Sequence, residues 1–199
     1  MEPTHVVGTI AAALTILFAW PQAWRALRAD HVEGISPVTS VMVLLTALSW
    51  LFFGILITDV PMMVANSCSG LAAACTVGVL IHRRAIQVPN AAIAFVCWLA
   101  VTFAAYLLLA ENGVGIVGTV LGATMAIPQA WHVFREGEDG VSIATYLLLA
   151  GVTASWLVYG ILIAKPVAVA PNVIALPAAL LIVARTAWDR YAVPRRAQV

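Results

Sequence analysis

The charged residues of this 199-residue chain are spaced so that they divide it into long apolar stretches. Seven stretches contain no Asp, Glu, Lys or Arg, namely 3–24, 34–58, 60–82, 85–110, 112–134, 140–164 and 166–184. A helix of about 20 mostly apolar residues crosses the hydrocarbon of a bilayer, which is roughly 30 Å thick. Lipid offers no partner to unpaired backbone groups, and no strand-like alternation is visible, so helices are expected. The sequence predicts an all-α membrane protein with seven transmembrane helices.

The composition excludes several other classes of protein. The chain is 63% hydrophobic and 10% charged, whereas soluble domains are about half apolar and about one quarter charged. A net charge of +1 leaves no basic surface for nucleic acid. Cys68, Cys75 and Cys97 lie in apolar stretches without metal-ligand spacing, which predicts free thiols and no metal. No nucleophile with a base and no phosphate loop is present, so we expect neither a cofactor nor an enzyme.

The basic residues predict the orientation in the membrane. If the N-terminus lies outside, all nine Arg residues fall on the inner side and Lys165 alone falls on the outer side. Cytoplasmic loops carry the excess of basic residues, so we expect an outer N-terminus and a cytoplasmic C-terminus. The first stretch has no basic leader and is expected to be a retained helix. The preference for Arg and Ala is typical of a GC-rich prokaryotic genome, which favours the plasma membrane.

An internal repeat relates the two halves of the chain at an offset of 106 or 107 residues. The matched pairs are Pro21-Gln22-Ala23-Trp24 with Pro128-Gln129-Ala130-Trp131, Ser49-Trp50-Leu51 with Ser155-Trp156-Leu157, and Asn66 with Asn172. The fourth stretch has no counterpart, and inserting it makes two three-helix units parallel. We therefore expect a first unit over 1–84, a linker helix over 85–111, a second unit over 112–188 and a cytoplasmic tail over 189–199.

These motifs resemble a known family of transporters. The Pro-Gln pair is similar to that of PQ-loop proteins, and the 3+1+3 layout resembles the SWEET sugar transporters, of which the semiSWEETs are the half-sized dimeric form. The resemblance covers residues 5–188 and includes Trp50-Leu51-Phe52-Phe53-Gly54, Trp156-Leu157-Val158-Tyr159-Gly160 and Ala170-Pro171-Asn172-Val173. It implies facilitated, gradient-driven and bidirectional diffusion of a small neutral sugar by alternating access.

Four residues of the repeats are predicted to meet at one depth. Trp50 and Asn66 are nine and seven residues from Asp59, and Trp156 and Asn172 stand at the same separations from Lys165. With a rise of about 1.5 Å per residue, all four reach the same level, slightly outside the midplane. Indole faces and amides suit the CH faces and hydroxyls of a sugar, although such residues also serve in packing.

The resemblance implies that this Trp and Asn quartet lines a central sugar pocket. Thr46 and Val152, one turn before each Trp, are expected to share the lining. For the gates, Pro21 and Pro128 lack an N–H and allow a bend, while Gln22 and Gln129 can bond to the freed backbone. A static kink is the alternative.

At the outer mouth, Asp59 and Lys165 either form a pair or are only solvated.

Alternative functions differ in the ionisable groups that they require. No Asp or Glu lies inside a stretch, which disfavours coupling to protons. A transporter of a neutral amino acid or another small metabolite, resembling cystinosin, and a receptor resembling the KDEL receptors stay open as alternatives. A retinal protein is excluded because residues 166–199 contain no Lys for a Schiff base. The identity of the sugar and assembly into homo-oligomers also stay open.

Overall fold

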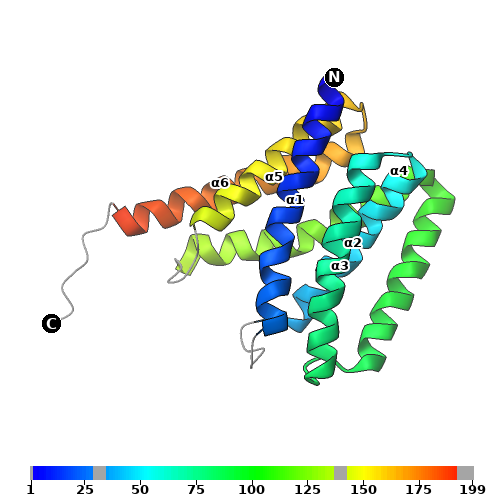
Figure 1. Cartoon of the computed structure of the whole chain (residues 1–199), viewed down its shortest axis with the longest axis horizontal. Coiled ribbons are helices and arrows are strands. Elements are labelled where there is room, and N and C mark those ends of the chain that lie inside the picture. Colours follow the sequence, from blue (N-terminus) through cyan, green and yellow to red (C-terminus); the bar gives the residue numbers. More distant parts are fainter. Residues whose placement is uncertain (1, 29–34, 137–142, 192–199) are drawn as a thin grey trace.

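The computed structural model describes residues 2–28, 35–136 and 143–191, and the side chains of Gln22, 125–136 and 189–191 lie outside this description. The elements are α1 (Pro3–Arg28), α2 (Pro37–Leu56), α3 (Val60–His82), α4 (Val88–Glu136), α5 (Ile143–Leu162) and α6 (Pro166–Tyr191) (Figure 1). Within the described ranges every element is a helix, and each of the six contains a segment long and apolar enough to cross a membrane. The expected all-helical membrane fold is confirmed.

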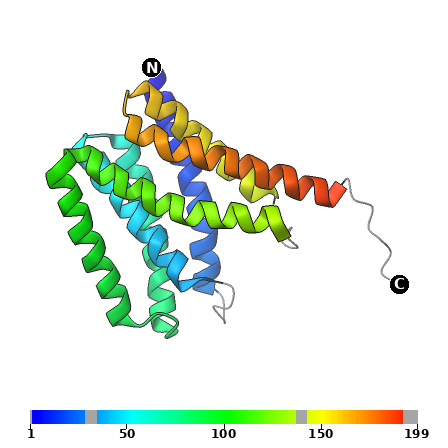
Figure 2. The ribbon, with the colours of Figure 1, turned by 180° about the vertical axis from the view of Figure 1, so that it is seen from behind.

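The longest helix, α4, consists of two helices joined at Ala110. Ala110 has φ 51° and ψ −140°, which is not a helical conformation. The 49 residues of α4 would span about 74 Å as one straight helix, far more than a bilayer requires. In Figures 1 and 2 the chain reverses direction between the two parts of α4. The part before Ala110 is therefore a separate span, and the part after it begins the second group of three helices.

The turns between helices repeat along with the sequence. The N–H of Asp59 bonds to the carbonyl of Gly54 at 2.8 Å, and the N–H of Lys165 bonds to that of Gly160 at 3.1 Å. The residue before each of these donors has a positive φ, 58° and 53°. This is the Schellman ending of a helix, in which the chain leaves in a left-handed conformation. The duplication thus extends to the backbone of the α2–α3 and α5–α6 turns.

Two bundles of three helices pack side by side. The first consists of α1, α2 and α3, and the second of the later part of α4 with α5 and α6. Between the bundles, α1 packs against α5. The later part of α4 packs against α2, since a Cβ on Gly118 would lie 3.2 Å from Ser49 Cβ. The first helix of each bundle therefore contacts the second helix of the other, as expected for parallel repeats related by an axis along the membrane normal.

The main core lies near one end of the molecule. We call this the amino-terminal end, where α1 begins and the α2–α3 and α5–α6 turns lie (Figure 1). The buried residues of this core, which we call the sealing cluster, are Phe53, Met62, Val114, Tyr159 and Ala168. They come from both bundles. Toward the opposite end, the second bundle inclines away from the first (Figures 1 and 2).

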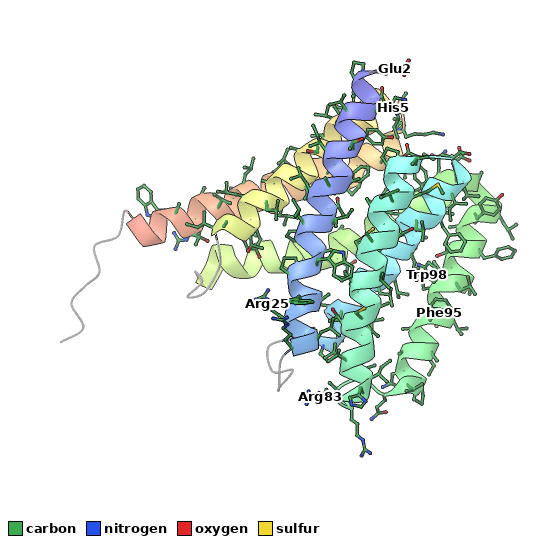
Figure 3. All side chains as sticks on the ribbon, in the orientation of Figure 1. Glu2, His5, Arg25, Arg83, Phe95 and Trp98 are labelled. Atoms are coloured by element: carbon green, nitrogen blue, oxygen red, sulfur yellow. The ribbon has the colours of Figure 1, made fainter. Side chains whose placement is uncertain are left out.

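The first part of α4 is fastened to the first bundle by a buried polar contact. The indole N–H of Trp98 donates to Ser49 Oγ at 2.9 Å, and both residues are buried. Phe95 and Phe52 pack their rings against Trp98; Figure 3 shows Trp98 and Phe95 on this helix. The remaining surface of the linker is largely apolar and exposed, as expected for a helix that faces lipid.

Candidate functional site

A cavity of about 290 Å³ lies between the two bundles. Its lining residues are Thr46, Trp50, Met62, Asn66, Gly118, Gly122, Leu149, Thr153, Trp156, Ala168, Pro171 and Asn172. They come from α2 and α3 of the first bundle and from α4, α5 and α6 of the second. The repeat therefore brings both of its Trp positions and both of its Asn positions to one cavity.

Five of the six residues expected in a binding site line this cavity, and Val152 does not. The repeat offset pairs Val152 with Thr46, but the lining contains Leu149 and Thr153 from α5 instead. These two precede Trp156 by seven and three residues and so share its helix face. Val152, four residues before Trp156, is buried in the packing of the helices, 8% exposed. Val152 is absent from this lining, and its expected contact with the ligand stays a prediction.

The two amides are held in the same way in the two bundles. Asn66 Nδ2 donates to the carbonyl of Met62 at 2.9 Å, and Asn172 Nδ2 donates to the carbonyl of Ala168 at 2.9 Å. Each bond fixes the side chain against its own helix through one N–H. An amide carries two N–H donors and one carbonyl acceptor, so each Asn can still offer both functions to a ligand.

The two indoles are also oriented by matching neighbours. Trp50 stands edge-to-face against Phe53, and Trp156 stands edge-to-face against Tyr159, with ring centroids 5.5 Å apart in both pairs. Such pairs contribute about 0.5–1.5 kcal/mol beyond burial of area. Because Phe53 and Tyr159 belong to the sealing cluster, the walls of the cavity rest on the core at the amino-terminal end.

The described residues of the lining are all neutral. Besides the indoles and amides it contains the hydroxyls of Thr46 and Thr153, which donate to carbonyls of their own helix at 2.8 and 3.0 Å and can accept from a ligand. A charged ligand would lose its hydration without meeting a counter-charge. In the described part of the chain no group of His, Cys, Asp and Glu could hold a metal ion. The arrangement fits a neutral ligand with an apolar face and several hydroxyls.

The cavity is closed toward the amino-terminal end. Met62 and Ala168 belong both to the cavity wall and to the sealing cluster. Beyond the cluster, the hydroxyl of Tyr159 donates to Asp59 Oδ2 at 2.7 Å, and Asp59 Oδ1 accepts from the N–H of Met62 at 2.9 Å. One carboxylate therefore caps α3 and joins it to α5 of the other bundle.

Of the two alternatives for Asp59 and Lys165, a pair or solvated charges, the structure shows no pair between them. Lys165 instead forms a salt bridge of 3.3 Å with Glu111, which begins the later part of α4. Both side chains are one-third exposed, so this bridge contributes little to stability. Asp59 and Lys165 do not pair because each has another partner. Glu111 belongs to the same bundle as Lys165, and Asp59 accepts a hydrogen bond from Tyr159.

The proline and glutamine positions are only partly described. Pro21 lies inside α1, which continues beyond it to Arg28, and its side chain is exposed. The side chains of Gln22, Pro128 and Gln129 lie outside the described part of the structure. Their expected role in gating therefore stays a prediction.

A matched pair of glycines is a feature that the sequence contains but that our motif comparison missed. Gly8 and Gly115 stand 107 residues apart, the offset of the Pro-Gln pair. A Cβ on Gly8 would lie 2.6 Å from Tyr159 Cε2, and one on Gly115 would lie 2.7 Å from Val167 Cγ2. Both glycines therefore permit the close packing that closes the amino-terminal end.

The sequence is similar to those of known transporters. Residues 5–82 match the family model described as "Sugar efflux transporter for intercellular exchange". The chain is 35% identical over 85 residues to the sugar transporter SemiSWEET of Escherichia coli (strain UMEA 3162-1), an alignment that covers 42% of this chain and 96% of that protein. The relative thus has the length of a single repeat unit.

Comparison of structures covers both units at once. The fold is similar to that of a eukaryotic SWEET transporter solved at 3.7 Å resolution, with a TM-score of 0.77. The match covers 95% of this chain and 96% of that one at 18% sequence identity. Because so few residues are identical, this likeness concerns the fold alone.

Proposed function

Because this chain belongs to the MtN3/SWEET family of sugar transporters, we propose that it moves a small neutral sugar by facilitated, bidirectional diffusion, using the cavity between its bundles. The observation that supports this most is the duplicated and uncharged lining. Each unit supplies one indole and one amide, and the helices of both bundles surround the ligand. A site shared between two bundles can be exposed to either side when the bundles rock.

We assign the ligand contacts to Trp50, Asn66, Trp156 and Asn172, with Thr46 beside them. The indole faces stack on the CH faces of the sugar, and the amides bond to its hydroxyls. The domains carry distinct tasks: the units over 1–84 and 112–188 each form half of the site, and the linker over 85–111 sets their parallel orientation. Since one chain contains both units, a monomer is sufficient for transport.

The neutral lining also supports an uncoupled mechanism. Transport driven by protons or sodium generally uses an ionisable group in the pathway. Among the described residues, the cavity wall contains no Asp, Glu, Lys, Arg or His. The sugar gradient itself therefore drives the flux. A cystinosin-like transporter would be expected to need a buried acid, and a receptor for a peptide carboxylate would need a cation in the pocket.

Opening and closing follow from the contacts between the bundles. We place the N-terminus outside the plasma membrane, because Arg25 and Arg83 lie at the end opposite Glu2 and His5 (Figure 3). With this orientation the sealing cluster forms the outer gate, and the bundles diverge toward the cytoplasm. Pro21 and Pro128, with Gln22 and Gln129, act as hinges near the inner gate.

Counterflow in proteoliposomes tests this proposal. Vesicles loaded with unlabelled glucose or sucrose are exposed to a trace of the labelled sugar, with and without an imposed proton gradient. We expect transient uptake of at least one sugar, with the same rate in both conditions. Uptake of a neutral amino acid in place of any sugar, or a flux that requires the proton gradient, would contradict the proposal.

A further inference from the structure

The two halves of the cavity differ in how their indoles are held. Trp156 Nε1 donates to Thr15 Oγ1 at 2.8 Å, and Thr15 Oγ1 donates in turn to the carbonyl of Ala11 at 2.8 Å. This bond crosses from α5 to α1 and joins the two bundles. Both hydrogen-bonding functions of the Thr15 hydroxyl are thus engaged, and the Trp156 N–H has no further proton to give.

The matching bond cannot form in the other half. At the offset of 107, Thr15 corresponds to Gly122 and Ala11 corresponds to Gly118. Gly122 has no hydroxyl, so α4 presents no side-chain acceptor at that position to Trp50. A Cβ on Gly118 would lie only 2.9 Å from Trp50 Nε1, which shows that the indole rests directly on the backbone of α4.

The indole N–H of Trp50 has no bond that matches the one between Trp156 and Thr15. Among the described residues none forms a side-chain hydrogen bond with Trp50, whereas the N–H of Trp156 is bonded to Thr15. The only buried side-chain polar atoms without a partner in the described part are the hydroxyls of Thr102 and Thr186, so Trp50 Nε1 is not fully buried. Since Trp50 lines the cavity, a ligand can reach this donor.

We infer that the two tryptophans have different tasks: Trp156, held by Thr15, offers only its face, whereas Trp50 also donates its N–H to an oxygen of the sugar. The inference rests on the proposed function. It makes Thr15 a positioning residue and makes the glycine at 122 a determinant of affinity. It also gives the site a direction, because a sugar with one well-placed acceptor oxygen binds in a single orientation although the bundles are related by a pseudo-twofold axis.

A matched pair of variants tests the role of Trp50. Thr and Val have nearly the same shape, and a Cβ at position 122 would have no neighbour closer than Thr46 Cγ2 at 4.0 Å. In Gly122→Thr the new hydroxyl accepts from Trp50, as Thr15 accepts from Trp156, and withdraws the donor from the sugar. In Gly122→Val the side chain has no hydroxyl, so the N–H of Trp50 stays available to the sugar. We expect Gly122→Thr to bind glucose or sucrose about tenfold more weakly than Gly122→Val in calorimetric titrations.

Deoxy sugars identify the acceptor. One monodeoxy glucose, which lacks the oxygen bonded to Trp50, should bind equally to the Thr and Val variants, while the other monodeoxy glucoses keep the tenfold difference. A second pair tests Thr15: Thr15→Val should raise the half-saturating sugar concentration in counterflow, and Thr15→Ser should restore it. These two pairs occupy different helices, so failure of one to fold leaves the other.

The outcomes distinguish failure of this inference from failure of the proposed function. If the wild type transports sugar but the Thr and Val variants bind it equally, the different tasks of the tryptophans are refuted and the proposed function stands. If the folded wild type neither binds nor transports glucose, sucrose or any other neutral sugar, the proposed function fails and this inference fails with it.

Discussion

The hydroxyl of Tyr159 donates a hydrogen bond of 2.7 Å to Asp59 Oδ2 and thereby joins α5 of the second bundle to the start of α3 in the first. The repeat contains this bond only once. At the offset of 106, Tyr159 corresponds to Phe53 and Asp59 corresponds to Lys165, so neither counterpart can reproduce it. The bond is the polar part of a closure that is otherwise made by the apolar sealing cluster.

Loss of this bond should favour opening of the amino-terminal end. Hydrogen bonds to charged groups contribute about 1.5–3 kcal/mol, so Tyr159→Phe should raise the open population about tenfold or more. The measurement is labelling of Ala168→Cys in the cavity wall by an impermeant thiol reagent from the Asp59 side. The native residues Cys68, Cys75 and Cys97 are first replaced by Ala.

Tyr106→Phe is the control for this experiment, since Tyr106 is exposed on the linker helix. It should leave the labelling rate of Ala168→Cys unchanged. Equal labelling rates in Tyr159→Phe and the parent protein would show that the sealing cluster alone determines the closure.

The helices pack so closely at Gly115 that a methyl group there should destabilise the protein. A Cβ there would lie 2.7 Å from Val167 Cγ2, and a β-branched side chain cannot rotate freely to avoid it. We expect Gly115→Ala to destabilise the protein by about 1–3 kcal/mol and to lower its Tm in detergent. Gly78→Ala serves as the control, because a Cβ at Gly78 meets nothing within 4 Å. In that variant the free energy of unfolding should rise by roughly 0.5–1 kcal/mol, because Ala has a better helix propensity than Gly. Identical Tm shifts in the two variants would refute the packing argument.

The attachment of the linker helix should depend on Ser49. Its hydroxyl accepts from the buried indole of Trp98, and Ser49→Ala leaves that donor without its partner. The expected cost is about 1–3 kcal/mol, measured as a lower Tm. Among the described residues, Ser155, the counterpart of Ser49, bonds only to the carbonyl of Gly151 in its own helix at 2.8 Å. Ser155→Ala should therefore change the Tm little. An effect of Ser155→Ala as large as that of Ser49→Ala would contradict a specific role for the Trp98 bond.

The spans and the two units could be predicted because membrane and duplication leave direct traces in sequence. Charges mark the ends of helices that must cross lipid, and repeated motifs show which helices correspond. Even the reversal at Ala110 was expected from the neighbouring Glu111, although alanine itself carries no turn signal. The convergence of Trp50, Asn66, Trp156 and Asn172 on one cavity follows from their equal separation from the turns.

The finer contacts could not be predicted, because they depend on helix rotation and on competing partners. The repeat offset pairs Thr46 with Val152, but the cavity is lined by the next residue, Thr153. Charges at a shared depth suggested Asp59 with Lys165, yet Tyr159 and Glu111 are the nearer partners. The bond from Trp156 to Thr15 connects residues of different units, and comparing the units with each other cannot reveal it.

In the proposed function, sugar crosses the membrane through the cavity that the two amides share. The most direct measurement is glucose and sucrose counterflow by Asn66→Ala and Asn172→Ala, beside Asn90→Ala at the exposed start of the linker as the control. Each cavity amide should contribute hydrogen bonds to the sugar, so each cavity variant should lose about tenfold or more in transport at low sugar concentration. The control should retain the wild-type rate. Full transport by both cavity variants would contradict passage of the sugar between these amides.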